Sequence, residues 1–130
     1  MFGVILDGVT YNLRVTYETL RRSFRIADGD NAGNMLSGYY QRDVIGTYYD
    51  YEMTVEADPN DPATYDNFYE AITAPVDSHE ITLPYGQGTI TFHAMVTEGE
   101  DYYRGTVGGR KRWGALRVLF TAIEVKREPE

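Results

Sequence analysis

The chain of 130 residues has no cysteine, one tryptophan and two histidines. The lack of cysteine excludes disulfides and thiolate zinc sites, and it is typical of proteins that mature in a reducing cytoplasm. No apolar run is long enough to span a bilayer, and the N-terminus has neither the basic region nor the apolar length of a signal peptide. We therefore expect one domain over residues 1–130, with no membrane contact and a core large enough to be stable without a disulfide or a metal site.

Positive charge is also scarce, because 12 Lys and Arg face 20 Asp and Glu, which gives a net charge of −8. Affinity for nucleic acid comes from neutralising phosphates with Lys and Arg. The sequence therefore predicts no specific nucleic-acid binding, in spite of the short basic run Arg110, Lys111 and Arg112. Tyrosine, in contrast, is abundant at twelve residues, and it suits half-buried strands and protein interfaces alike.

One helix is well signalled, over residues 62–74 approximately. Asp61 can cap the first free N–H groups, and Pro62 suits the first helical position because its missing donor costs nothing there. Pro75 disfavours helical geometry in the residue before it, which ends the helix. One apolar stripe follows the helical period and predicts the buried face: Tyr65, Phe68, Tyr69 and Ile72.

The rest of the chain alternates apolar and polar residues with the period of two that is typical of β-strands. This predicts a mainly-β fold, an antiparallel β-sandwich or barrel with the helix packed against it. The expected strands are 2–6, 9–15, 20–26, 43–57, 79–83, 89–97 and 115–125. We expect long loops at about 28–42 and 98–112, the second being a loop or a protruding hairpin. The predicted strand contribution to the core is Phe24, Ile26, Tyr51, Met53, Val55, Phe92, Val96, Val118 and Phe120.

No pattern of catalytic residues is present. The stretch 28–33 begins like a calcium loop, but Ala32 offers no oxygen at the fifth position and Tyr39 stands where a bidentate Glu belongs. His79 and His93 match no zinc spacing, and the glycines before Arg110 do not have the spacing of a phosphate-binding loop. We therefore expect no catalytic residues, no metal and no cofactor, and a protein that is not an enzyme.

The order of elements resembles the tail-tube family of long-tailed bacteriophages, a two-sheet β-sandwich or barrel flanked by one helix. Three tracts are also similar to small tail structural proteins from prophages of Gram-positive bacteria: 65–84, 84–87 and 113–122. The resemblance implies a non-enzymatic phage or prophage virion structural protein, synthesised in the cytoplasm of a bacterial host. Tail terminator, distal-tail-like and minor tail protein all stay open, because the chain is short for a complete tail-tube protein.

Further expectations follow from this resemblance. It implies that the chain assembles with itself into rings, by family analogy hexamers, and contacts other tail proteins, with no small-molecule substrate. The alternative is a small β-sandwich module that binds a ligand or a protein. Because aromatic residues are enriched at interfaces, the candidate subunit interface is Tyr39, Tyr40, Tyr102, Tyr103 and Trp113. If the strand 43–57 faces the bore of a ring, the candidate acidic lumen face is Asp50, Glu52 and Glu56.

Overall fold

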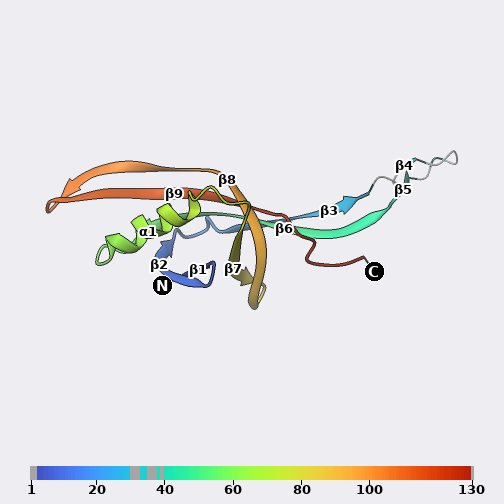
Figure 1. The fold of residues 1–130 in the computed structure, drawn as a ribbon, viewed down its shortest axis with the longest axis horizontal. Helices are drawn as coiled ribbons and strands as arrows, with labels where there is room; N and C mark the ends of the chain where they lie inside the picture. Colours follow the sequence, from blue (N-terminus) through green and yellow to red (C-terminus); the bar gives the residue numbers. More distant parts are fainter. Residues whose placement is uncertain (1–2, 30–32, 35–37, 39, 130) are drawn as a thin grey trace.

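The computed structural model describes residues 3–29, 33–34, 38 and 40–129. These residues form antiparallel strands and a single helix, which confirms the mainly-β prediction (Figure 1). The elements are β1 (Gly3–Leu6), β2 (Val9–Val15), β3 (Arg21–Asp28), β4 (Gly33–Asn34), β5 (Tyr40–Gln41), β6 (Val44–Ala57), α1 (Pro62–Ile72), β7 (His79–Tyr85), β8 (Gly88–Val107) and β9 (Arg110–Ala122).

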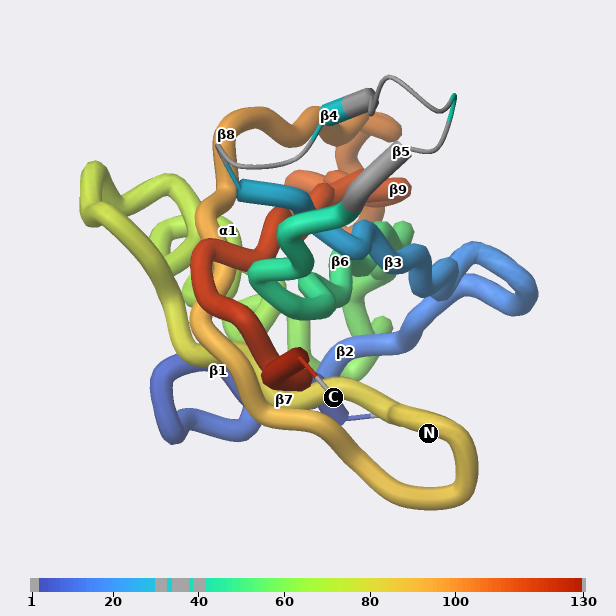
Figure 2. The backbone as a smooth tube through the Cα atoms, turned by 90° about the vertical axis from the view of Figure 1, so that its right-hand side faces the viewer, coloured from blue at the N-terminus to red at the C-terminus, as the bar shows by residue number. Residues whose placement is uncertain are grey.

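The main sheet closes on itself. Its strand order is β2-β1-β7-β8-β9-β6-β3, and β2 pairs in addition with β6. Six strands therefore form a closed antiparallel circuit, a small barrel, and β3 lies outside it. Figure 2, turned by 90°, shows β1, β2 and β7 on the lower side of the molecule and β3 and β6 above them.

The strand β6 makes closure possible because it is long enough to serve three partners. One edge pairs with β9, from Tyr51 opposite Phe120 to Val55 opposite Leu116. The other edge pairs with β3 as far as Glu52 and then, from Val55 onward, with β2. We call β3 together with the paired part of β6 (44–52) the overhang, because it extends past the closed barrel (Figure 1).

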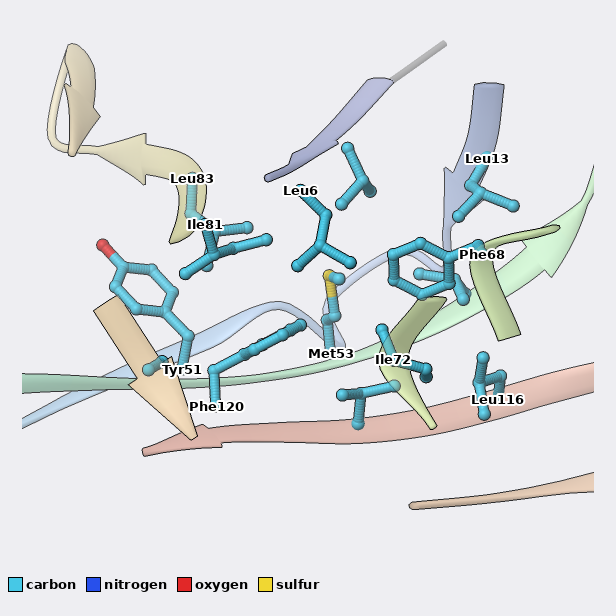
Figure 3. Close-up of a cluster of buried hydrophobic side chains, with 14 of the residues drawn as sticks. Leu6, Leu13, Tyr51, Met53, Phe68, Ile72, Ile81, Leu83, Leu116 and Phe120 are labelled. Carbon is cyan, nitrogen blue, oxygen red and sulfur yellow. The ribbon is translucent and has the colours of Figure 1, made fainter. Parts of the chain in front are cut away.

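The core lies inside the barrel and under the helix. Figure 3 shows side chains from α1 and from β1, β2, β6, β7 and β9 converging on one cluster. The Tyr51 hydroxyl, at the edge of the cluster, donates to the Pro84 carbonyl oxygen at 2.8 Å, so its polar end is satisfied. The buried apolar residues are Val4, Leu6, Leu13, Tyr51, Met53, Val55, Tyr65, Phe68, Ile72, Ile81, Leu83, Ile90, Phe92, Ala94, Leu116, Val118, Phe120 and Ala122.

The helix begins at Pro62 and ends at Ile72, with Thr73 as its C-cap. The Asp61 side chain accepts from the Thr64 N–H, as the capping argument predicts. Phe68 is fully buried, and its ring meets the ring of Tyr11 edge to face at 5.3 Å. The packing of the helix on the sheet is confirmed, two residues shorter than the predicted range.

Three predicted core residues are wrong. Phe24 is 68% exposed and Ile26 is 46% exposed, because they lie on the overhang, where no second layer covers them. Tyr69 is 39% exposed, because only the narrower stripe of Tyr65, Phe68 and Ile72 is buried beneath α1. The other predicted core residues are buried, apart from the partly buried Val96.

The two predicted loops also need correction. Residues 98–112 belong to β8 and β9, so this segment is the protruding hairpin and not a loop. Within 28–42, β4 and β5 pair with each other, Gly33 opposite Gln41 and Asn34 opposite Tyr40. Residues 30–32, 35–37 and 39 lie outside the described part of the chain.

A buried histidine attaches the first hairpin to the barrel. His79 is 5% exposed, and its Nδ1 lies 2.6 Å from Oδ2 of Asp7 in the β1–β2 turn. The other oxygen of that carboxylate accepts from the Glu80 N–H at 2.8 Å. Burial alone raises the pKa of Asp7, but the hydrogen bonds from His79 and Glu80 outweigh it and hold the pKa below its usual value.

The first prediction compares two phenylalanines with opposite burial. Phe68→Ala removes a fully buried ring and should lower the free energy of unfolding by about 3–5 kcal/mol. Phe24→Ala, on the uncovered overhang, should change it by less than about 0.5 kcal/mol. Urea unfolding of both variants beside the wild type measures this, and equal losses would contradict the assigned burial.

The second prediction concerns acid stability. A carboxyl whose pKa is lower in the folded state stabilises the fold above the unfolded pKa, and that stabilisation is lost as the pH falls through the folded pKa. Asp7→Asn should therefore be less stable than the wild type at neutral pH, and the difference should shrink below about pH 4. Unfolding curves from neutral to acid pH test this, and a gap independent of pH would show that the Asp7 charge contributes nothing.

Candidate functional site

The outer half of the β8–β9 hairpin stands apart from the barrel. The register runs from Tyr102 opposite Gly114 to Val107 opposite Arg110, closed by a turn at Gly108 and Gly109. Both turn glycines have positive φ, 58° and 78°, a conformation that side chains disfavour. In Figure 1 the hairpin extends past α1, with its tip at the end of the molecule opposite to β4 and β5. Several large side chains on it are exposed: Tyr102, Tyr103, Val107 and Trp113.

A kink at the base of the hairpin decides which way its side chains point. Ala115 has a φ of 54°, and its N–H donates to Oε1 of Glu56 at 3.0 Å. A Cβ on Gly114 would overlap the side-chain ends of Glu56 and Arg104, so a larger residue there would displace this ion pair. Gly114 thus faces the side of the sheet that carries Glu56. Its neighbour Trp113 lies with Tyr65 of α1.

A single hydrogen bond joins the helix to the hairpin. The hydroxyl of Tyr65, a residue only 2% exposed, donates to Oδ2 of Asp101 at 2.9 Å. Burial and this carboxylate both raise the pKa of Tyr65 well above its ordinary value, so the hydroxyl stays protonated and donating. The contact fixes the orientation of the hairpin base against α1.

Two hollows flank this contact. The first is a cleft of about 420 Å³ whose charged lining is mixed: Arg14, Arg104, Lys111 and Arg112 with Glu56, Asp58 and Asp66. The second, about 390 Å³, we call the aromatic groove; it is lined by Tyr65, Asp66, Tyr69, Glu70, Asp101 and Trp113. The groove is lined by three aromatic rings and three carboxylates, and it shares Tyr65, Asp66 and Trp113 with the first cleft.

The opposite face of the sheet carries a row of ion pairs along β6, which we call the charged ladder. Asp50 accepts from Nε of Arg25 at 2.8 Å, and this bond raises the pKa of Arg25 above its usual value. Glu52 accepts from Arg21 at 3.1 Å and from Arg117 at 2.6 Å. Glu56 accepts from Arg104 at 2.7 Å.

The three residues of the predicted acidic lumen face belong to the charged ladder. Asp50, Glu52 and Glu56 do share one face of β6, as the alternation indicates. Each of them, however, pairs with at least one arginine from β3, β8 or β9. The face is therefore not a row of uncompensated acid. The sequence could not show this, because the partners come from strands distant along the chain.

The predicted interface residues separate into two groups. Tyr102, Tyr103 and Trp113 come together on the exposed hairpin, where the rings of Tyr103 and Trp113 lie 5.0 Å apart. Tyr40 belongs to β5, and Tyr39 lies outside the described residues. Two residues that line the aromatic groove, Tyr69 and Asp101, are not among the site residues predicted from the sequence. The hydroxyl of Tyr69, at the margin of the helical stripe, is the only signal that could have shown its outward position.

Other chemistry is sparse. His93 contacts Glu124 at 3.2 Å and, more weakly, Glu80 at 3.9 Å on the surface. Within residues 3–29, 33–34, 38 and 40–129 there is no group of three or more His, Asp or Glu side chains that could hold a metal. Over the same residues, no helix is long and apolar enough to cross a membrane.

Comparison with known proteins adds no family to this description. No model of a protein family matches the chain, and no curated protein matches its sequence.

The third prediction tests the link between helix and hairpin. Tyr65→Phe keeps the buried ring but leaves the Asp101 carboxylate without its donor, and should lower the free energy of unfolding by about 1.5–3 kcal/mol. Amide hydrogen exchange should also quicken in β8 near Asp101 while that of β1 and β7 does not change. Tyr69→Phe, whose ring is exposed, is the matched control. Equal exchange in both variants would contradict the anchoring role.

Proposed function

We propose that this chain is a non-enzymatic structural subunit of a phage or prophage tail, and that its copies assemble into rings by joining free strand edges. The observation that carries the proposal is the pair of free edges at the two ends of one sheet, β8-β9-β6-β3. In the part of the chain that the structure describes, no strand pairs with the outer edge of β3. Beyond Ala94, none pairs with the edge of β8 that faces away from β9.

Free strand edges of this length can pair with a strand of another chain. A long unpaired strand presents a row of N–H and C=O groups, and natural monomers usually cover or shorten such edges. Here β3 has 8 residues and the unpaired part of β8 reaches to Val107. Neither is protected by proline. Pairing with another copy would satisfy both edges at once.

The charges on the two edges are complementary. The strand β3 carries Arg22, together with Arg21 and Arg25, which also pair with Glu52 and Asp50 inside the chain, and the free part of β8 carries Glu98, Glu100 and Asp101 beside a single arginine, Arg104. Opposite charges across neighbouring strands stabilise pairing, whereas like charges disfavour it. Pairing of β3 with β8 is therefore favoured over pairing of either edge with itself, which would give a two-fold dimer.

Strand directions are compatible with a ring. Because every neighbouring pair in β8-β9-β6-β3 is antiparallel, β8 and β3 run in opposite directions. Strands that tilt relative to the ring axis stagger neighbouring copies along the strands. With that stagger β3 of one copy, whose Phe24 is level with Ala94 within its own chain, meets the free part of β8 of the next copy antiparallel. Such a heterologous contact gives a ring when the rotation between copies closes. Six copies is the number suggested by resemblance to the tail family.

In such a ring the bore would be lined by the charged ladder. The helix covers the other face of the sheet, so a ring with α1 outward turns Asp50, Glu52 and Glu56, with their arginines, toward the axis. The sequence predicts an acidic bore, whereas the proposed ring has a bore lined by paired charges. Absence of specific nucleic-acid binding stays a prediction for this surface.

A second candidate function is a module that binds a ligand or a protein. It is favoured by the first cleft of about 420 Å³, a volume within the range of small-molecule sites. Under this alternative the protein stays monomeric at every concentration. The two functions therefore separate on oligomeric state alone.

The fourth prediction tests edge pairing. Light scattering across a concentration series, with negative-stain imaging, should show wild-type rings that dissociate as salt rises, because the contact is between opposite charges. Glu98→Arg should weaken assembly by several-fold, since it places a cation against β3.

The matched control is Asp77→Arg, the same charge change at an exposed position before β7, away from both edges. It should assemble like the wild type. A wild type that stays strictly monomeric at high concentration and shows no rings by imaging would reject the proposed function and leave the binding module ahead.

A further inference from the structure

The aromatic groove has the chemistry of a receptor for a large apolar side chain beside a cation. Tyr69 and Trp113 expose 39% and 42% of their surface, so part of each side chain is accessible to a partner. Asp66, Glu70 and Asp101 complete the lining, and the basic residues Arg104, Lys111 and Arg112 line the adjoining cleft that shares Asp66 and Trp113 with the groove. An apolar group would lie against the rings, while an arginine would meet carboxylates and the faces of aromatic rings, both of which attract cations.

The overhang displays a complementary set of side chains. Phe24 and Ile26 are exposed on the face of β3 that continues the core face of the sheet, since Phe24 lies opposite Tyr49 and Ile26 opposite Thr47 in the register. Arg22 lies on the same face, opposite the buried Tyr51. An exposed Phe and Ile beside an arginine form an apolar surface with a positive charge, the complement of the groove.

The two surfaces belong to different ends of the molecule. In Figure 1 the overhang extends toward β4 and β5, and the hairpin that lines the groove extends the opposite way. The overhang therefore cannot fill the groove of its own chain. Both surfaces do lie on the helix-covered face of the sheet, because α1 supplies Tyr65 and Tyr69 to the groove.

We propose that the aromatic groove receives Phe24 of a second copy of this chain, with Arg22 of that copy against the groove's carboxylates. The inference rests on the proposed ring. When β3 of one copy extends the sheet at β8 of the next, its helix-side residues fall on the face that holds the groove. Strand pairing supplies the backbone contact. Phe24 in the groove determines which copy is bound and in which register its strand pairs.

Trp113 provides a direct probe, because it is the only tryptophan of the chain. A synthetic peptide of residues 20–28 is added to the protein at a concentration low enough to keep it monomeric. We expect a saturable shift of Trp113 emission. The same peptide with Phe24→Ala should bind about 10-fold more weakly, because central aromatic anchors carry much of the binding energy. A peptide with Arg22→Glu should lose about 5-fold.

A charge exchange tests the same contact in the whole protein. Glu70→Arg and Arg22→Glu should each weaken assembly, and the double variant should recover it, because the pair is restored with the charges exchanged. Asp77→Arg is again the control that should leave assembly intact. Since Glu70 and Arg22 are both exposed, neither change should prevent folding.

The outcomes separate this inference from the proposed function. Rings whose assembly ignores Glu70→Arg and Arg22→Glu, with no emission change on adding the peptide, would overturn the groove contact and leave the ring standing. A monomeric protein that still binds the peptide in a Phe24-dependent way would retain the contact and reject the ring. A protein that neither assembles nor binds the peptide would reject both.

Discussion

The fold depends on how one edge of β6 is divided between two partners. The edge pairs with β3 as far as Glu52 and with β2 from Val55, and the Thr19 hydroxyl accepts from the Thr54 N–H at the junction. If β3 occupied the whole edge, β2 could not reach β6 and the barrel would stay open. If β2 occupied it all, no overhang would form. The division therefore creates at once a closed core and an exposed strand that the core does not need.

The same geometry separates stability from assembly. The buried residues come from the circuit of six strands and α1, so substitutions on β3 or on the outer hairpin leave the core intact. Under the proposed assembly this separation is useful, because Phe24 and Trp113, two of the large exposed apolar side chains, lie on segments that contribute nothing to the core. The two segments lie at opposite ends of the sheet.

Local signals in the sequence predicted where the helix and the strands lie better than they predicted which residues are buried. Asp61 and Pro62 specify the helix start by themselves, and β6 reads clearly because its alternation is unbroken. Alternation shows which residues share a face but not whether another layer covers that face. It therefore predicts burial for Phe24, which lies beyond the part of the sheet that the core covers. The hairpin was harder, since register shifts near Gly99, Tyr102 and Gly105 break the period of two. The aromatic groove could not be foreseen, because it joins α1 to a strand 36 residues away through Tyr65 and Asp101.

The charged ladder bears on what a ring of this chain could do for passing DNA. A bare row of carboxylates repels phosphate strongly, and an unpaired row of arginines would retain it. Carboxylates that are each paired with arginine give a weaker field of short range, because opposite charges at hydrogen-bond distance largely cancel beyond a Debye length. The ladder engages three carboxylates with four arginines, so the net charge of −8 comes from the rest of the chain. A bore lined by the ladder would therefore neither retain nor strongly repel a phosphate backbone, and the long-range repulsion would come from acidic residues outside it.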